Sequence, residues 1–306
     1  DDAHQESPGS GYLHLSQGNR YLPSLYQYPN LNSQLFAVNT GTLEVWWCSW
    51  LLTNRVAAGI QIPSHVRRYR NIWPATHTNY ALCFNGVDAY ASSADRINGP
   101  QQFTLECWFR STTPGGLLVG FGNARTGLSS SYDRQIYMNA AGKIAFRVYN
   151  GSTKTIVSTT NYNDGAWHHT AASLSPAGMR LYMDGQLQAQ DATVTNALQY
   201  AGYWRMGGDN TSDGTPWFNG CIDDVRVWDV ARTQAEIDFD RASELNDPED
   251  EETLSDYYKC NEGTGSNALD SAGLVSYAQL YGGTSWSTNA APLVLALQPD
   301  LWGLLV

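Results

Sequence analysis

Short runs of alternating side chains are the sequence feature that most limits how this chain folds. In the segment 103–110 the odd positions hold Phe, Leu, Cys and Phe, and the even positions hold Thr, Glu, Trp and Arg. A period of two places successive side chains on opposite faces of a β-strand. The pattern returns at 144–148, 179–183 and 225–228, with Gly or Asn turns between the runs. Regularly spaced short strands of this kind indicate an all-β sandwich.

The composition favours the same fold class. Of the 306 residues only 15% are charged, 12% are aromatic and 28 are Gly, a mixture typical of strands and tight turns rather than long amphipathic helices. This length suits one large all-β domain with extensions. No apolar run approaches eighteen residues, so the sequence predicts no membrane span.

The charge balance argues against a nucleic-acid partner. The net charge is −11, whereas phosphate binding needs clustered Lys and Arg. The one basic run, at 65–70, is short and lies between Pro63 and Pro74. We interpret it as a solvated turn, with a polyanion site as the alternative.

The five cysteines form no recognisable framework. An odd number excludes complete intrachain pairing, and the spacing CxxC of metal and redox motifs is absent. Cys83 and Cys107 lie in apolar strand patterns, so we expect both to be buried free thiols.

Local signals divide the chain into four segments. We predict a flexible or extended arm over 1–33, a strand-containing N-terminal region over 34–78, the main sandwich over 79–243, and an acidic linker with C-terminal strands over 244–306. The last segment either completes the sandwich or begins another unit. Asp184-Gly185 predicts a tight hairpin, because both residues tolerate positive φ. The capping box Thr233 to Glu236 predicts one short helix.

Six fragments in a fixed order carry a family resemblance. They are ALCFNGVDAY at 81–90, FTLECWF at 103–109, DGAWHH at 164–169, LYMDGQ at 181–186, FNGCIDDVRVW at 218–228 and AEI at 235–237. Together they resemble laminin-G-like and pentraxin-like domains of the concanavalin A-like lectin/glucanase superfamily, in the form found as bacterial-style repeats. The resemblance implies a jelly-roll sandwich of two antiparallel sheets with one short helix, in an extracellular (secreted or cell-surface) protein. Unlike pentraxins, this chain has Ala171 where the second cysteine of their core disulfide stands.

The resemblance also implies a calcium site. The Gly-rich loop 207–214 falls where pentraxins place acidic calcium ligands, and Asp133 falls near another such position. Ca²⁺ prefers carboxylate and amide oxygens held on loops. We therefore expect a Ca²⁺ site formed by Asp133, Asp209, Asn210 and Asp213, with ordinary turn capping as the alternative for these residues. Asp88 is a weaker candidate.

Aromatic residues near the same loop predict ligand contacts. Trp and Tyr stack on the apolar faces of sugars, while amides and carboxylates bind hydroxyl groups. Trp217, which follows Pro216 in the loop, and Tyr132 are the residues that we expect to touch a ligand.

The sequence does not predict an enzyme. Glycoside hydrolases of this jelly roll need paired carboxylates, usually as Glu-x-Asp-x-x-Glu, and Asp223-Asp224 has no glutamate at that offset. We expect Asp223 to accept hydrogen bonds from backbone amides. The adjacent His168 and His169 point to opposite faces of a strand, so they are unsuited to share a metal ion.

These observations predict an extracellular, non-catalytic recognition module with calcium-assisted binding of carbohydrate or glycoprotein. The alternative is a structural, assembly or adhesin subunit of an extracellular filament, sheath or surface layer. In that case the partners would be neighbouring copies of the chain, joined through sheet edges.

Overall fold

The computed structural model describes residues 78–245, 248–272 and 276–295, together with the backbone of seven strands in 1–77. The chain divides into two units, Asp1–His77 and Thr78–Val306. The expected boundaries near 33 and 243 thus fall inside units. The basic run at 65–70 lies outside the described residues except for the backbone of 67–69.

The first unit contains a four-stranded and a three-stranded sheet. The four-stranded sheet consists of β1 (Ala3–Glu6), β2 (Tyr12–Gln17), β3 (Arg20–Tyr21) and β4 (Leu25–Tyr26). The three-stranded sheet consists of β5 (Gln34–Asn39), β6 (Glu44–Ser49) and β7 (Arg67–Tyr69). The segment 1–33 therefore holds strands and not only an arm.

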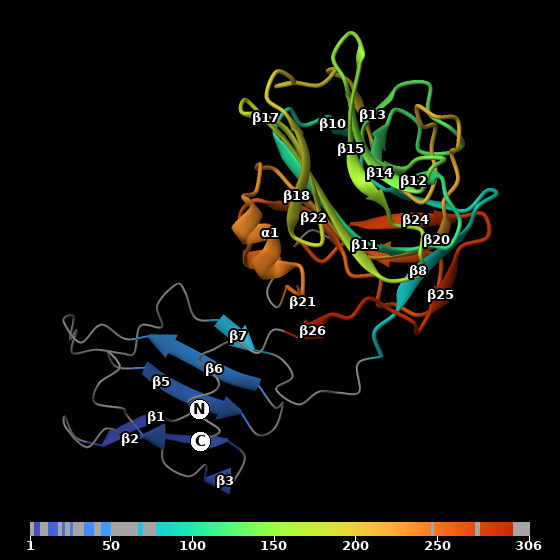
Figure 1. Cartoon of the computed structure of the whole chain (residues 1–306). Helices are drawn as coiled ribbons and strands as arrows, with labels where there is room; N and C mark the ends of the chain where they lie inside the picture. Colours follow the sequence, from blue (N-terminus) through green and yellow to red (C-terminus); the bar gives the residue numbers. More distant parts are fainter. Residues whose placement is uncertain are drawn as a thin grey trace. The chain divides into compact units, whose positions relative to one another are not determined.

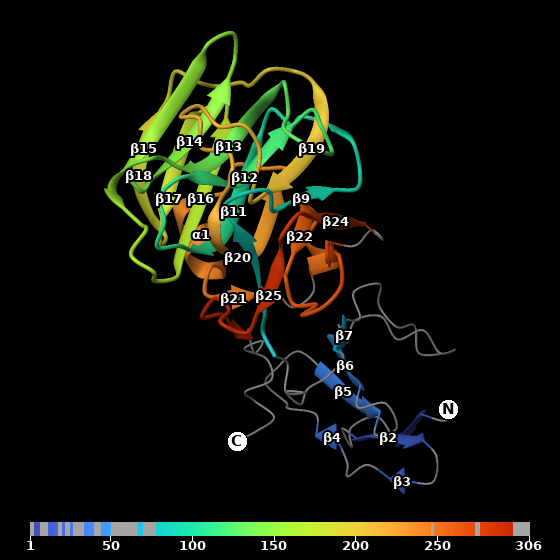
Figure 2. The same ribbon diagram turned by 90° about the vertical axis from the view of Figure 1, so that its right-hand side faces the viewer.

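The second unit is a jelly-roll sandwich of two antiparallel sheets, which confirms the predicted fold class (Figures 1 and 2). In order, the nine-stranded sheet has β15 (Thr153–Asn161), β14 (Lys143–Tyr149), β13 (Tyr132–Met138), β12 (Gly116–Gly122), β19 (Ala201–Met206), β9 (Tyr90–Ser93), β24 (Tyr277–Tyr281) and β23 (Asn267–Leu269), with β10 (Ile97–Asn98) beside β19. The segment after residue 254 supplies strands to both sheets, so it completes this sandwich.

The second sheet has eight strands. In order it has β18 (Gln186–Asp191), β17 (Gly178–Met183), β16 (His168–Ser175), β11 (Phe103–Arg110), β20 (Asn219–Trp228), β8 (Ala81–Asn85) and β25 (Ser285–Ser287), with β22 (Leu254–Tyr258) also paired to β20. Two further short pieces are the parallel pair β21 (Ser243–Glu244) with β26 (Val294–Leu295), and the 3₁₀ turn η1 (Pro248–Asp250).

The core lies between the two sheets and follows the period-two pattern. All four odd residues of β11 are fully buried in it, among them Phe103 and Phe109. Phe103 meets Phe146 of the opposite sheet edge to face, with ring centroids 6.1 Å apart. Burying apolar side chains of this size is the main favourable term for such a fold.

Helix α1 (Gln234–Asp240) covers part of the outer face of the eight-stranded sheet (Figure 1). Its N-cap is Thr233, and the predicted capping box with Glu236 is present. Ile237 packs on Ala171 and Tyr182 of the sheet. Among the described residues, no helix is long and apolar enough to cross a membrane.

Buried ion pairs line the same outer face. Arg232 Nη1 lies 3.0 Å from Glu106 Oε1, and Arg226 Nη2 lies 2.7 Å from Asp224 Oδ2. Burial raises the pKa of Glu106, but a hydrogen bond from His169 and the charge of Arg232 outweigh it and lower that pKa to about 2. Because buried charges are costly unless paired, the Arg232 pair holds the segment before α1 on the sheet. Arg226, paired within β20, holds the segment after α1 by donating to the Ser243 carbonyl.

The sequence fragments 164–169 and 181–186 contact each other through hydrogen bonds of Asp184. His168 Nδ1 lies 2.9 Å from Asp184 Oδ2, and Nε2 lies 3.2 Å from Asp164 Oδ1. Asp184 Oδ1 also accepts the backbone N–H of His169 at 2.9 Å. Asp184 and Gly185 have φ of 50° and 79°, as the predicted Asp-Gly hairpin requires. His169 points instead to Glu106, so the two imidazoles lie on opposite faces.

The prediction of a free thiol at Cys83 is wrong, because Cys83 forms a disulfide with Cys221. The two residues are directly opposite each other on β8 and β20, with Cα atoms 3.9 Å apart. Their separation of 138 residues hides this pairing from any local pattern. Cys107 is free and buried, as predicted, and Cys260 is also free and buried.

The disulfide is expected to stabilise the second unit. A cross-link that closes a loop this long restricts the unfolded chain, so replacing both cysteines with Ala should lower the free energy of unfolding by about 4 kcal/mol. Urea denaturation of wild type and double variant, each with and without reductant, measures the difference. Reductant should shift only the wild-type midpoint, and a shift in neither protein would contradict the bond.

The His168 cluster should make stability depend on pH. The hydrogen bond to Asp184, with the charges of Asp184 and Asp164, raises the pKa of His168 above 6.5 despite the opposing effect of burial. Protonated His168 therefore stabilises the fold fully below pH 6.5, and this contribution is lost as the pH rises through the raised pKa. NMR titration should locate that pKa and show it lowered in Asp164→Asn. A His168 pKa at or below the ordinary value in wild type would refute the coupling.

Candidate functional site

The loop 207–217, which joins β19 to β20, is folded back on itself by backbone hydrogen bonds. Gly208 forms an isolated antiparallel bridge with Trp217, and the Asp209 amide donates to the Pro216 carbonyl at 3.2 Å. Gly207 has φ of 74°, which starts the turn away from β19. The loop is thus a short hairpin with Trp217 at its returning end.

Asp209 ties this hairpin to the loop 123–131. Its buried carboxylate accepts the Ser129 amide and hydroxyl, both at 2.7 Å. Asn210 adds a hydrogen bond from its Nδ2 to the Ser129 carbonyl at 2.8 Å. A Cβ on Gly122 would collide with the Asp209 and Ser129 side chains, so glycine is needed beneath them. Asp209 and Asn210 therefore brace two loops.

Asp213 lies farther along the hairpin and is exposed. Its Oδ1 accepts the hydroxyls of Thr211 and Thr215 at 2.8 and 2.9 Å, and Oδ2 accepts the Ala140 amide at 3.2 Å. These are turn contacts of the kind that Asp commonly makes.

Asp133 does not join the hairpin, because its carboxylate binds Arg134 and Tyr200. It is buried, with Oδ1 at 2.5 Å from Arg134 Nη1 and 3.0 Å from the Tyr200 hydroxyl. Burial raises the pKa of Asp133, and the charge of Arg134 opposes that rise. Within the described part of the chain, no hydrogen bond of Asp133 reaches the hairpin.

The four residues of the predicted calcium site are therefore divided. Asp209, Asn210 and Asp213 share one loop, whereas Asp133 serves a separate buried cluster. Across residues 78–245, 248–272 and 276–295, no three His, Cys, Asp or Glu residues gather as a metal-binding group. The calcium site stays a prediction, and a bound ion would compete with the bracing contacts of Asp209. Asp88, the weaker candidate, accepts Asn85 Nδ2 at 2.7 Å.

The two predicted ligand-binding aromatics lie at different ends of β12. Tyr132 is opposite Gly122, and the Arg147 guanidinium carbon lies 4.7 Å from its ring centroid. Trp217 follows Pro216, whose carbonyl accepts the Leu117 amide. At about 3.3 Å per residue, the step from Leu117 to Gly122 separates them by roughly 17 Å. They do not form one platform.

Instead, Trp217 belongs to an aromatic row with Tyr90 and Tyr281. The Trp217 and Tyr90 centroids are 5.9 Å apart, and Tyr90 and Tyr281, paired on β9 and β24, stack at 4.7 Å. Trp217 and Tyr281 are half-buried, whereas Tyr90 is buried between them. Tyr90 and Tyr281 were not predicted, because only the strand pairing reveals their position beside Trp217.

A buried arginine supports this aromatic row from the sheet. The Arg205 guanidinium carbon lies 4.3 Å from the Tyr90 ring centroid, and Arg205 Nη2 donates to the Gly127 carbonyl at 2.8 Å. The Gly127 amide in turn donates to the Tyr90 hydroxyl at 3.0 Å. Tyr90 is therefore held in place by Arg205 and Gly127, and parts of Trp217 and Tyr281 are exposed to solvent.

The acidic pair on β20 has structural partners. Asp223 Oδ2 accepts the Ala291 amide at 2.8 Å, which confirms the predicted backbone contact. Burial raises the pKa of Asp223 well above its usual value. Asp224 is held by Arg226.

A laminin G family model, described as the concanavalin A-like lectin/glucanases superfamily, matches residues 85–238. A search of curated proteins found no match. Solved structures that share the fold include the following two. A candidate carbohydrate binding protein from Bacteroides ovatus ATCC 8483 aligns with a TM-score of 0.52 and 18% identity, over 83% of this chain and 70% of that one. The heptameric SAP-like pentraxin of Limulus polyphemus aligns with a TM-score of 0.50 and 14% identity, over 71% of this chain and 98% of that one.

The bracing role of Asp209 can be separated from metal binding. Asp209→Asn removes a buried carboxylate that accepts two hydrogen bonds from Ser129, so it should lower the free energy of unfolding by about 2 kcal/mol without any calcium present. The exposed neighbour gives the control, since Asp213→Asn should cost less than about 1 kcal/mol. Urea denaturation in chelator measures both variants. Equal costs would contradict the brace.

Proposed function

Because the chain belongs to the concanavalin A-like lectin/glucanases superfamily, we propose that it is a non-catalytic module that binds carbohydrate. The proposed contact surface is the aromatic row on the outer face of the nine-stranded sheet. The observation that carries the proposal is Trp217, half-exposed and held at the returning end of the 207–217 hairpin. An aromatic ring fixed in this way offers a sugar an apolar surface at little cost in conformational entropy.

The surroundings of Trp217 support a glycan ligand. Thr215 and Asp213 on the same hairpin supply hydroxyl and carboxylate groups, and sugar sites combine such polar groups with an aromatic surface. The Bacteroides ovatus protein that shares the fold is itself described as a candidate carbohydrate binding protein.

An extracellular location forms part of the proposal. The Cys83–Cys221 disulfide supports it, since disulfides persist mainly in oxidising compartments. A glycan or glycoprotein at a cell surface or in a matrix is the partner class that such a location provides.

Calcium is proposed only as an aid to binding. Asp213 is the carboxylate of the hairpin that is open to solvent, and Asp209 is already engaged by Ser129. An ion bound at Asp213 would add a group that binds sugar hydroxyls to the hairpin that carries Trp217. Chelator would then weaken glycan binding without abolishing it.

A glycan array probed with and without calcium tests the proposal. Trp217→Ala should reduce binding of the best glycan by about 10-fold, because the stacked ring is lost. Phe239→Ala is the matched control, since Phe239 is an aromatic side chain 83% exposed on α1, apart from the row. Unchanged binding by Trp217→Ala would exclude the aromatic row as the site. Absence of binding to any glycan, with and without calcium, would reject the function.

A further inference from the structure

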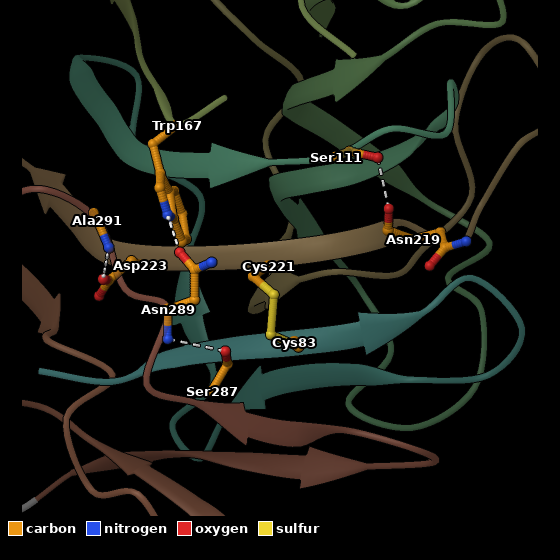
Figure 3. Close-up of a disulfide and its surroundings, with 9 residues drawn as sticks. All are labelled: Cys83, Ser111, Trp167, Asn219, Cys221, Asp223, Ser287, Asn289 and Ala291. Atoms are coloured by element: carbon orange, nitrogen blue, oxygen red, sulfur yellow. Dashed lines mark hydrogen bonds between the residues drawn. A yellow bond between two sulfur atoms is a disulfide. The ribbon is translucent and has the colours of Figure 1, made fainter. Parts of the chain in front are cut away.

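A second surface lies on the outer face of the other sheet. Arg110 at the end of β11 is opposite Cys221 on β20, which is opposite Cys83 on β8, which is opposite Ser285 on β25. The four side chains therefore form one row across the sheet. Trp167, from the loop before β16, lies against Arg110 of this row, and Figure 3 shows its indole pointing to Asn289.

Trp167 is held in place from two sides. Its Nε1 donates to Asn289 Oδ1 at 3.2 Å, and the Arg110 guanidinium carbon lies 5.6 Å from the ring centroid. Arg110 and Trp167 are both half-buried, and Asn289 is exposed. We call these three residues the Trp167 surface.

The floor of the Trp167 surface is rigid. The disulfide joins β8 to β20 in the row that contains Arg110 (Figure 3). The segment that carries Asn289 is fixed by the Ala291 amide, which donates to the fully buried Asp223. The backbone N–H of Asn289 donates to Ser287 Oγ at 3.1 Å. A ligand would therefore meet positions already set, so little ordering would be required on binding.

Among the described residues, the charge of Arg110 has no carboxylate partner. Arg226 and Arg232 on the same sheet face pair with Asp224 and Glu106, but no carboxylate among the described residues lies within ion-pair distance of Arg110. The nearest acid on its face of β20, Asp223, already accepts the Ala291 amide. In the same described part of the chain Arg180 and Arg205 also lack a carboxylate, but Arg110 lies against the Trp167 ring, next to the exposed Asn289, and this combination suits an external anion.

We propose that the Trp167 surface binds an acidic sugar, whose carboxylate pairs with Arg110 while its ring and hydroxyls contact Trp167 and Asn289. A guanidinium binds a carboxylate through two parallel hydrogen bonds, and the cation–π contact with Trp167 keeps the Arg110 guanidinium beside the indole. Asn289 presents its Nδ2 to a hydroxyl because its Oδ1 is taken by Trp167. This inference rests on the proposed carbohydrate-binding function but places acidic sugars at a different sheet from the aromatic row.

The test uses the whole chain and two matched probes, oligogalacturonate and its neutral methyl ester. NMR of the indole N–H groups in wild type should show the Trp167 signal shifting with the acid probe and remaining fixed with the ester. Arg110→Gln should weaken binding of the acid by at least about 10-fold, and Arg110→Lys should give an intermediate loss because the bidentate geometry is removed. Arg180→Gln, a change of equal charge on β17, should bind as wild type.

The outcomes separate this site from the aromatic row. Acid binding that survives Trp217→Ala but not Arg110→Gln supports the Trp167 surface, whether or not neutral glycans bind at Trp217. Loss of acid binding in Trp217→Ala alone, or equal losses in Arg110→Gln and Arg180→Gln, would overturn it. The proposal would also be overturned if the Trp167 indole N–H signal of the wild-type protein did not shift when the acid probe is added. This measurement does not depend on whether any variant folds.

Discussion

The pairing of β20 is the constraint on which the rest of the second unit depends. One edge of this strand pairs with β11, and the other pairs first with β8 and then with β22. Asp223 and Asp224 lie at the break between those two partners, and Asp224 has φ of 50°. The strand therefore joins the beginning, middle and end of the sandwich, and its backbone hydrogen bonds can form only when all three are in place.

The side chains of β20 extend this role to both faces. Val225 and Val227 enter the core, while Arg226 on the other face binds Asp224 and the Ser243 carbonyl. Cys221 links covalently to β8, and Asp223 fixes the segment around Ala291. Since a buried charge or amide left unpaired is costly, each contact selects one arrangement of the chain around the strand.

The two candidate ligand surfaces result from how the outer faces are covered. Helix α1 and its ion pairs cover part of the eight-stranded sheet, and Trp167 with Arg110 lies at the Cys221 end. On the nine-stranded sheet, the hairpin 207–217 and the loop 123–131 are tied together by Asp209, and Trp217 stands at their margin. In both places a rigid framework presents an aromatic residue from a loop, an arrangement common in recognition modules.

Much of the fold could be predicted, but less of the site. The alternation in β11, the Asp184-Gly185 hairpin and the Thr233 capping box are local patterns, and the structure contains all three. The proposed calcium residues were chosen as polar groups near one loop. Their hydrogen-bond partners, such as Ser129 for Asp209 and Tyr200 for Asp133, come from distant parts of the chain.

The strands, their buried faces and the tight turns follow from the sequence alone, because each depends on residues a few positions apart. The family follows from six such local fragments in a fixed order. Three contacts are visible only in the folded chain: Cys83 with Cys221, Tyr90 and Tyr281 with Trp217, and Arg110 with Trp167. The physical reason is that strand pairing between remote segments sets these contacts. A period of two tells which face a side chain occupies but not which strand lies next to it.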